Sequence, residues 1–214
     1  MILSDNRRFF RKITMKTLHL SVDLQNCFSL MRPGLLSCWG PVKEQTLLLD
    51  TALQKFDVPT ASISFSFQFV PFEEGIGHYR DTPKETQAIL DGNERVRFSM
   101  PVSPFSLVGY KTGCSAQRQT EIDGYVSRKG VKRLILSGFT EADTEETWGC
   151  CISQTARDFI DAGCEVIIAA EATHRGVESA VTEYRALTER QALHRKFGVD
   201  VAPIENILSV FRHG

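Results

Sequence analysis

One stretch of the sequence combines a candidate nucleophile with a local structure that would activate it. Two adjacent cysteines, Cys150 and Cys151, follow a polar loop and open a segment whose apolar residues recur at helical spacing. A cysteine in the first turn of a helix lies near free backbone amides and the positive end of the helix dipole, which favour a thiolate. We therefore expect Cys151 to ionise more readily than an ordinary thiol and to act as a nucleophile.

Two charged residues elsewhere in the chain could complete this chemistry. Asp23 lies near the end of an alternating polar and apolar run, and Lys111 ends a shorter run that begins at Phe105. Both runs are predicted strands, and the carboxyl ends of parallel strands meet at the edge of the sheet where ligands bind. A carboxylate can take the thiol proton, and a lysine can keep that carboxylate ionised. We therefore expect Asp23, Lys111 and Cys151 to form one catalytic group.

The rest of the chain alternates between strand and helix patterns. Strands are expected at residues 17–24, 60–70, 105–111, 131–137, 164–170 and 199–202, and helices at 42–56, 115–129, 151–162, 179–197 and from 204 onward. Such alternation predicts right-handed crossovers between parallel strands. The predicted fold class is therefore α/β, a three-layer α-β-α sandwich with a mostly parallel sheet of about six strands.

Length, charge and cysteine content narrow the class of protein. The 214 residues suit one domain, expected over residues 15–214, with residues 1–14 as a short arm or an organelle-targeting extension. A net charge of -1 leaves no excess of positive charge to attract nucleic acid. No apolar run approaches the ~20 residues of a membrane helix. The cysteines are expected to stay reduced, so we predict a cytoplasmic protein.

Three motifs, in this order, resemble the isochorismatase-like cysteine hydrolase superfamily, which includes nicotinamidases and N-carbamoyl amide hydrolases. They are Ser21-Val22-Asp23-Leu24-Gln25-Asn26-Cys27-Phe28, Gly109-Tyr110-Lys111-Thr112 with Ser115-Ala116, and Cys151-Ile152-Ser153-Gln154-Thr155-Ala156. The resemblance covers most of the chain from Met15 to about Val201. It implies the Rossmann-like fold of that superfamily and a homo-oligomer, either a dimer, a tetramer or a larger ring.

The resemblance also implies roles for the three candidate catalytic residues. Asp23 would be the general acid and base, Lys111 its charged partner and Cys151 the nucleophile. Cys151 is selected over Cys150 because a Thr-Ala pair follows Cys151 by four and five residues, as in the family pattern. The implied reaction is cleavage of an amide-type C–N bond of a small-molecule substrate through a thioester, without a cofactor. Two alternatives stay open: a vinyl-ether hydrolase of the isochorismate type that uses Asp23 as the acid, and a non-catalytic homologue.

Four further residues are candidates for the substrate pocket. Thr147 is the nearest threonine upstream of the nucleophile, so the resemblance makes it the candidate for the oxyanion position, with the Cys151 amide as second donor. The others are Gln25 beside the acid, Phe72 in the long irregular stretch after the second strand, and Trp148 beside the cysteines. We expect these side chains to contact the substrate.

The segment from Gly138 to Cys151 departs from the family pattern. It is longer than the family's short loop at this point and contains four acidic residues. We expect a solvated loop, with a substrate-selecting flap as the alternative.

A second departure concerns metal binding. Nicotinamidases place an Asp-x-His and a later histidine for zinc after the second strand. This chain has Phe67-Gln68-Phe69-Val70-Pro71-Phe72 there, with His78 alone beyond it. The chain has no C-x-x-C pair, and its histidines and cysteines do not fall at zinc-ligand spacing. We therefore expect no metal site.

Overall fold

The computed structural model of the protein describes residues 16–24, 36–65, 107–111, 114–117, 122–142, 144–146, 149–175 and 187–212. The predicted arm, residues 1–14, lies outside these ranges. So do the four candidate pocket residues, Gln25, Phe72, Thr147 and Trp148, and the zinc-site stretch from Phe67 onward. The expectations for these segments stay predictions.

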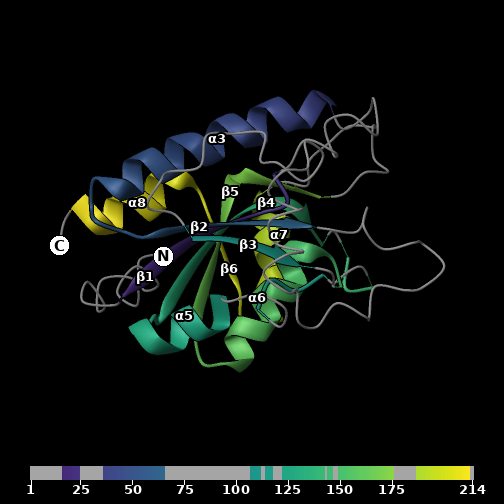
Figure 1. Ribbon diagram of the computed structural model, residues 1–214. Coiled ribbons are helices and arrows are strands. Elements are labelled where there is room, and N and C mark those ends of the chain that lie inside the picture. The colour runs from purple at the N-terminus through teal and green to yellow at the C-terminus, as the bar shows by residue number, and fades with distance from the viewer. Residues whose placement is uncertain are drawn as a thin grey trace, which may run out of the picture.

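A parallel sheet forms the centre of the molecule (Figure 1). Its strands are β1 (Thr17–Val22), β2 (Thr60–Phe65), β3 (Leu107–Lys111), β4 (Arg133–Glu141), β5 (Glu165–Arg175) and β6 (Asp200–Ala202). Their order across the sheet is β3-β2-β1-β4-β5-β6, and every neighbouring pair among the described strands is parallel. The prediction of a mostly parallel sheet of about six strands is confirmed.

Helices cover both faces of this sheet. Helices α3 (Leu36–Gln54) and α8 (Ile204–Arg212) lie along one face, and α5 (Ile122–Lys129) and α6 (Cys151–Asp161) lie along the other (Figure 1). Helix α7 (Leu187–Arg195) joins the α6 side, because its buried Leu193 belongs to the same core cluster as Phe159 of α6. The predicted three-layer α-β-α sandwich is therefore confirmed.

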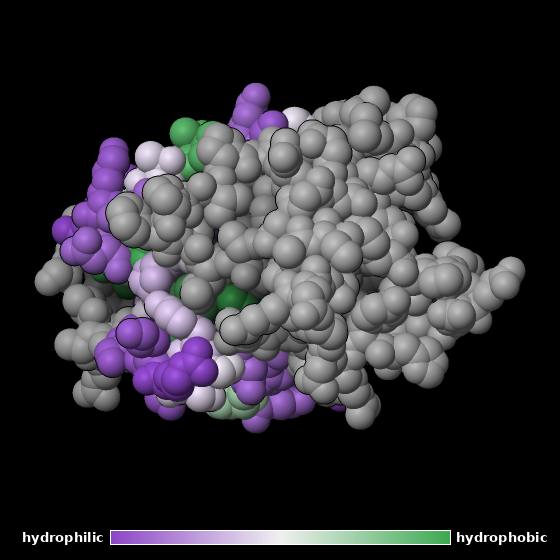
Figure 2. Space-filling view, viewed as in Figure 1, coloured by the Kyte–Doolittle hydropathy of each residue, from purple (hydrophilic) through white to green (hydrophobic). Residues whose placement is uncertain are grey.

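Strand β4 shows why the central strands are apolar along their whole length. Leu134 and Leu136 pack in the core on the α6 side, whereas Ile135, which lies between them, packs under α3 and α8. Both faces of the strand are therefore buried, as expected for a parallel sheet covered on two sides. The outer surface over α5 is by contrast hydrophilic (Figure 2), with Asp123, Arg128 and Lys129 exposed.

The strand order creates one natural place for a site. Connections run outward in both directions from the adjacent strands β1 and β4, so the order reverses between them. In doubly wound sheets, ligands bind in the crevice beyond the carboxyl ends of the strands at this switch point. Asp23 follows directly after β1, and the chain after β4 leads to Cys151 at the start of α6. The topology therefore brings both candidate residues to the switch point.

Strands β4 and β5 continue past their predicted ends at Ser137 and Ala170. Gly138 pairs with Thr173 and Phe139 with His174, although the register shifts twice along this extension. The expectation of a solvated loop from residue 138 onward is therefore wrong for its first part, which is strand up to Glu141. The connection to α6 is correspondingly shorter than the sequence suggested.

The predicted helix from Ser115 to Lys129 also changes. Helix α5 begins only at Ile122, and residues 114–117 form bends next to the N-terminal half of α6. The prediction is therefore wrong at residues 115–117, which are not helical and include only one apolar side chain, Ala116.

A buried polar cluster fastens α3 to the sheet. His19 of β1 contacts the Asp50 carboxylate through Nδ1 and the Ser137 hydroxyl through Nε2, both at 2.9 Å. Gln54 Nε2 donates to the other oxygen of Asp50 at 3.0 Å. His19 and Ser137 are almost fully buried, so the removal of one member leaves polar atoms of the others without partners.

We predict that Asp50→Ala lowers the free energy of unfolding by about 1–3 kcal/mol, because it leaves the buried His19 nitrogen unpaired. Urea denaturation monitored by circular dichroism measures the change. Glu44→Ala is the matched control, since Glu44 is exposed on the same helix. A loss at Asp50 no larger than the loss at Glu44 would contradict this account.

Candidate active site

A buried ion pair lies beyond the ends of β1 and β3. Lys111 Nζ is 2.9 Å from Asp23 Oδ2, and the two side chains are 0% and 2% exposed. Strand β2 lies between β1 and β3, so the lysine side chain reaches past one strand to meet the carboxylate. A buried lysine or aspartate alone would be very costly, and the pairing offsets that cost.

Cys151 completes this group from the other half of the sheet. It is the first residue of α6, and its thiol makes side-chain hydrogen bonds with both Asp23 and Lys111. Cys150 precedes it as the N-cap residue, with an extended backbone (φ -66°, ψ 159°) and no side-chain capping bond. The structure therefore brings together the three residues that the sequence analysis proposed, and their catalytic roles stay predictions.

The environment of Asp23 suits a residue that exchanges protons. Burial raises the pKa of its carboxyl well above the ordinary value, and the nearby Lys111 ammonium opposes that rise only in part. Burial by itself would lower the pKa of Lys111, but the Asp23 carboxylate and the Cys151 sulfur raise it. The lysine therefore stays charged, while the carboxylate becomes a stronger base than a solvated one.

A second cysteine, Cys114, contacts the nucleophile candidate. The hydrogen bond with Cys151 lowers the pKa of the Cys114 thiol to about 6. The same bond and burial raise the pKa of Cys151 to about 12. The expectation that Cys151 ionises readily is therefore wrong, because the hydrogen bond with Cys114 and burial both raise the pKa of its thiol. Activation of this thiol then depends on a base beside it, and Asp23 is in place to supply one.

The backbone around Asp23 is unusual. Asp23 has φ 60°, a left-handed conformation that costs energy for a residue other than glycine and that clusters at functional sites. Gly138 of β4 pairs with Val22, the residue before Asp23, and has φ 105°; a Cβ atom on Gly138 would lie 2.0 Å from the carbonyl oxygen of Val22. Only glycine permits this close approach of β4 to the end of β1.

Side chains of α6 hold neighbouring segments in place. The Thr155 hydroxyl accepts a hydrogen bond from the Ala116 amide at 2.9 Å, which fastens the segment after Lys111 to the helix. Ser153 Oγ accepts from the Ala142 amide at 2.8 Å, which fastens the chain after β4 to the same helix. These contacts give a physical reason for the Ser and Thr of the cysteine motif.

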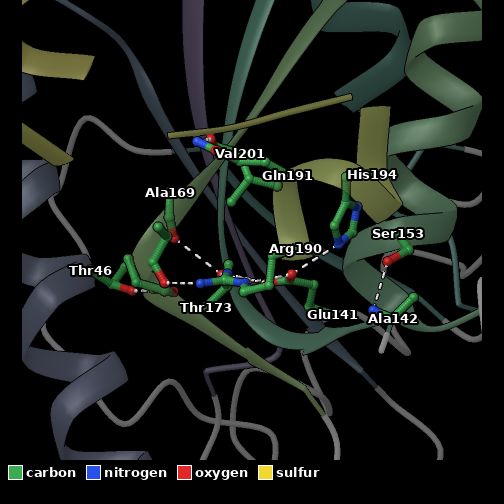
Figure 3. Close-up of polar contacts among 12 residues, drawn as sticks. Thr46, Glu141, Ala142, Ser153, Ala169, Thr173, Arg190, Gln191, His194 and Val201 are labelled. Carbon is green, nitrogen blue, oxygen red and sulfur yellow. Dashed lines mark hydrogen bonds and ion pairs between the residues drawn. The ribbon is translucent and has the colours of Figure 1, made fainter. Parts of the chain in front are cut away.

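A buried charge cluster anchors the end of β4. Figure 3 shows the Glu141 carboxylate between Arg190 and His194 of α7. Arg190 Nε and His194 Nε2 each lie 2.9 Å from Glu141 Oε1, and the Thr173 hydroxyl donates to Oε2 at 2.9 Å. These bonds outweigh the effect of burial and lower the pKa of Glu141 to about 2. This cluster fixes the start of the connection that leads to Cys151.

Cys114 and Glu141 were not among the predicted site residues. Cys114 lies three residues after Lys111, and this short spacing was the signal that could have included it. Glu141 appeared as one of several loop acids, because its partner Arg190 lies about fifty residues away in the chain.

Among the described residues, no group of three or more His, Cys, Asp and Glu side chains could hold a metal ion. None of the described helices is long and apolar enough to cross a membrane.

Fold and site together define a parallel α/β protein with an Asp-Lys-Cys group at its topological switch point. The model of the isochorismatase domain matches residues 17–194. The chain therefore belongs to the isochorismatase family, whose members are hydrolases. A search of curated protein sequences finds no significant match.

Solved structures share the fold at low sequence identity. N-carbamoylsarcosine amidase from Thermoplasma acidophilum has a TM-score of 0.61 and 19% identity, over 89% of this chain and 98% of that one. A cysteine hydrolase from Pseudomonas syringae has a TM-score of 0.64 and 15% identity, over 92% and 93%. Nicotinamidase from Bacillus subtilis has a TM-score of 0.60 and 16% identity, over 88% and 99%. At these identities the likeness establishes the fold alone.

We predict that Gly138→Ala lowers the free energy of unfolding more than Gly163→Ala does. Both glycines have positive φ (105° and 83°), so alanine carries about 1–2 kcal/mol of backbone strain at either position. At Gly163 nothing lies within 4 Å of the new Cβ, whereas at Gly138 it overlaps the Val22 carbonyl. Urea denaturation of the two variants makes the comparison, and equal losses would rule out the steric explanation.

Glu141 should make the stability of the protein depend on acid pH. Its pKa falls from 4.5 to about 2 in the folded protein, so its stabilising contribution is complete above about pH 5 and is lost as the pH falls through about 2. The difference in unfolding free energy between the wild type and Glu141→Gln should therefore shrink over this range. Glu146→Gln, at an exposed carboxylate, is the control. A difference that stays constant with pH would count against the prediction.

Proposed function

We propose that this chain hydrolyses an amide-type C–N bond of a small molecule, with Cys151 as nucleophile, Asp23 as general acid and base, and Lys111 as the cation that organises them. The observation that carries the proposal is the mutual contact of these three side chains at the switch point, with the Cys151 sulfur hydrogen-bonded to a carboxyl group of raised pKa. The amidases among the structural neighbours support the choice of bond.

The first half of the reaction forms a thioester. Asp23 takes the proton of the Cys151 thiol as the sulfur attacks the carbonyl carbon of the substrate. The C–N bond then breaks, and Asp23 gives the same proton to the leaving nitrogen, so ammonia or an amine departs. One residue can serve in both directions because burial raises the pKa of the Asp23 carboxyl well above its ordinary value, which makes the carboxylate a stronger base.

The second half releases the acid product. Asp23 takes a proton from water, whose oxygen attacks the thioester carbon. The C–S bond breaks, the product leaves as the acid, and the proton returns to the Cys151 sulfur. Lys111 stays charged throughout, and its ammonium stabilises both the Asp23 carboxylate and the sulfur when it is negative.

Backbone amides at the start of α6 are suited to stabilise the developing oxyanion. The amide of Cys151 is one of the first of the helix and has no intrahelical partner to donate to. Thr147 is the proposed source of the second donor. A single donor of this kind is worth about 3 kcal/mol of transition-state stabilisation.

The test is an ammonia-release assay over a panel of primary carboxamides and N-carbamoyl amines. For a compound that the wild type hydrolyses, Cys151→Ala should abolish turnover and Asp23→Asn should reduce it by at least about 10²-fold. Cys164→Ala should retain activity, since Cys164 is a buried thiol outside the site. Acid quenching during turnover should also trap the acyl group on the Cys151 peptide, which mass spectrometry detects.

The variants separate the proposal from its competitors. Full activity in Cys151→Ala with loss in Asp23→Asn would instead indicate vinyl-ether cleavage, in which the acid protonates the substrate and the thiol is dispensable. The trapped acyl group tests the remaining case. If no compound of the panel is hydrolysed and none leaves an acyl group on Cys151, the chain is a non-catalytic homologue.

A further inference from the structure

Two cysteines meet at the site, although the proposed reaction uses only one sulfur. Cys114 lies three residues past Lys111 and is exposed, whereas Cys151 is half-buried at the start of α6. Their thiols form a side-chain hydrogen bond with each other. Neither cysteine is in a disulfide. The proposed mechanism assigns no task to Cys114, so its contact with the nucleophile needs another explanation.

The structure keeps Cys114 close to Cys151 without fixing it rigidly. The Ala116 amide donates to Thr155 Oγ1 at 2.9 Å, and Thr155 lies one turn after Cys151 on the same helix. The segment that carries Cys114 is therefore fastened to α6 two residues further on. Cys114 itself lies in a bend, outside any helix or strand. Formation of the ~2.05 Å sulfur–sulfur bond would therefore require movement of a bend and not of a helix or strand on the Cys114 side.

We propose that Cys114 and Cys151 are a redox pair that a hydroperoxide converts to a disulfide and a thiol reductant restores. The disulfide would occupy the nucleophilic sulfur and so switch off the hydrolysis, a consequence that rests on the proposed function. Formation of the bond does not depend on that function.

The oxidation proceeds in two balanced steps. The Cys114 thiolate attacks one peroxide oxygen, the O–O bond breaks, and Cys114 becomes a sulfenic acid while hydroxide leaves. The Cys151 sulfur then attacks the Cys114 sulfur, and the S–O bond breaks. The proton of Cys151 leaves with the departing hydroxyl group as water, and the first hydroxide takes the proton that the Cys114 thiol had released. Two thiols thus lose two electrons and two protons, and hydrogen peroxide becomes two molecules of water.

The environment selects these two sulfurs among the described cysteines. Cys114 is exposed and its pKa of about 6 makes it a thiolate at neutral pH, which is the form that peroxide oxidises. Cys164 is buried, and its thiol lies 3.8 Å from the Val131 carbonyl oxygen. Cys150 lies near Cys114 as well, but the hydrogen bond of Cys114 is with Cys151. A bond to Cys151 is therefore favoured over one to Cys150.

Hydrogen peroxide treatment of the full chain tests the proposal directly. The intact monomer should lose the mass of two hydrogens, and non-reducing peptide mapping should find Cys114 joined to Cys151. Dithiothreitol should reverse the change completely. In Cys114→Ser the same treatment should form no disulfide at Cys151, because the thiolate that peroxide oxidises is absent. Cys150→Ser and Cys164→Ser should still form the bond.

Other products would overturn the proposal. A disulfide that joins Cys150 to either neighbour, a bond between two chains, or overoxidised Cys151 in the wild type would each show that Cys114 does not protect the nucleophile. Hydrolase activity is measured separately from disulfide formation. If the bond forms but hydrolysis continues, the redox pair stands and Cys151 is not the nucleophile. If Cys151→Ala is inactive and peroxide forms no bond, the proposed function stands and the redox pair does not.

Discussion

The buried ion pair between Lys111 and Asp23 is the interaction on which the rest of the site depends. A lysine with no exposed side-chain surface stays charged only because a carboxylate lies beside it, and the carboxylate is in turn held by the lysine. The pair joins segments that follow two non-adjacent strands, β1 and β3. It therefore sets the depth and orientation at which the Cys151 thiol meets both charges.

The protein keeps this pair in place partly through strained backbone. Asp23 occupies a left-handed conformation, and β4 passes it at a distance that only Gly138 allows. Such strain persists when the surrounding structure holds it, and here the flanking strands β1 and β4 are paired along six residues. The rigid sheet thus fixes the aspartate, while bends and helix termini carry the two thiols.

Two buried charge clusters lie along the carboxyl edge of the sheet, and they are suited to different roles. The Asp23 cluster has raised carboxyl pKa and contacts sulfur, so it is suited to move protons. In the Glu141 cluster, Arg190 and His194 keep the carboxylate ionised with a pKa of about 2, so it is suited to hold the end of β4 in place. The same residue type therefore serves opposite purposes, because the charges and donors around it differ.

Sequence patterns predicted the layer architecture, and the three motifs that resemble the isochorismatase-like superfamily pointed to Asp23, Lys111 and Cys151. Hydrophobic periodicity indicated most of the strands and helices, since burial on two faces leaves a continuous apolar pattern. The contact between Cys114 and Cys151, and the opposite pKa shifts that it causes, could be seen only in the folded structure, because the two residues lie far apart in the sequence. Glu141 likewise became strand and buried charge only through Arg190 and His194. Periodicity reports which face of an element is buried; it carries no information on which distant charge or sulfur a side chain will meet.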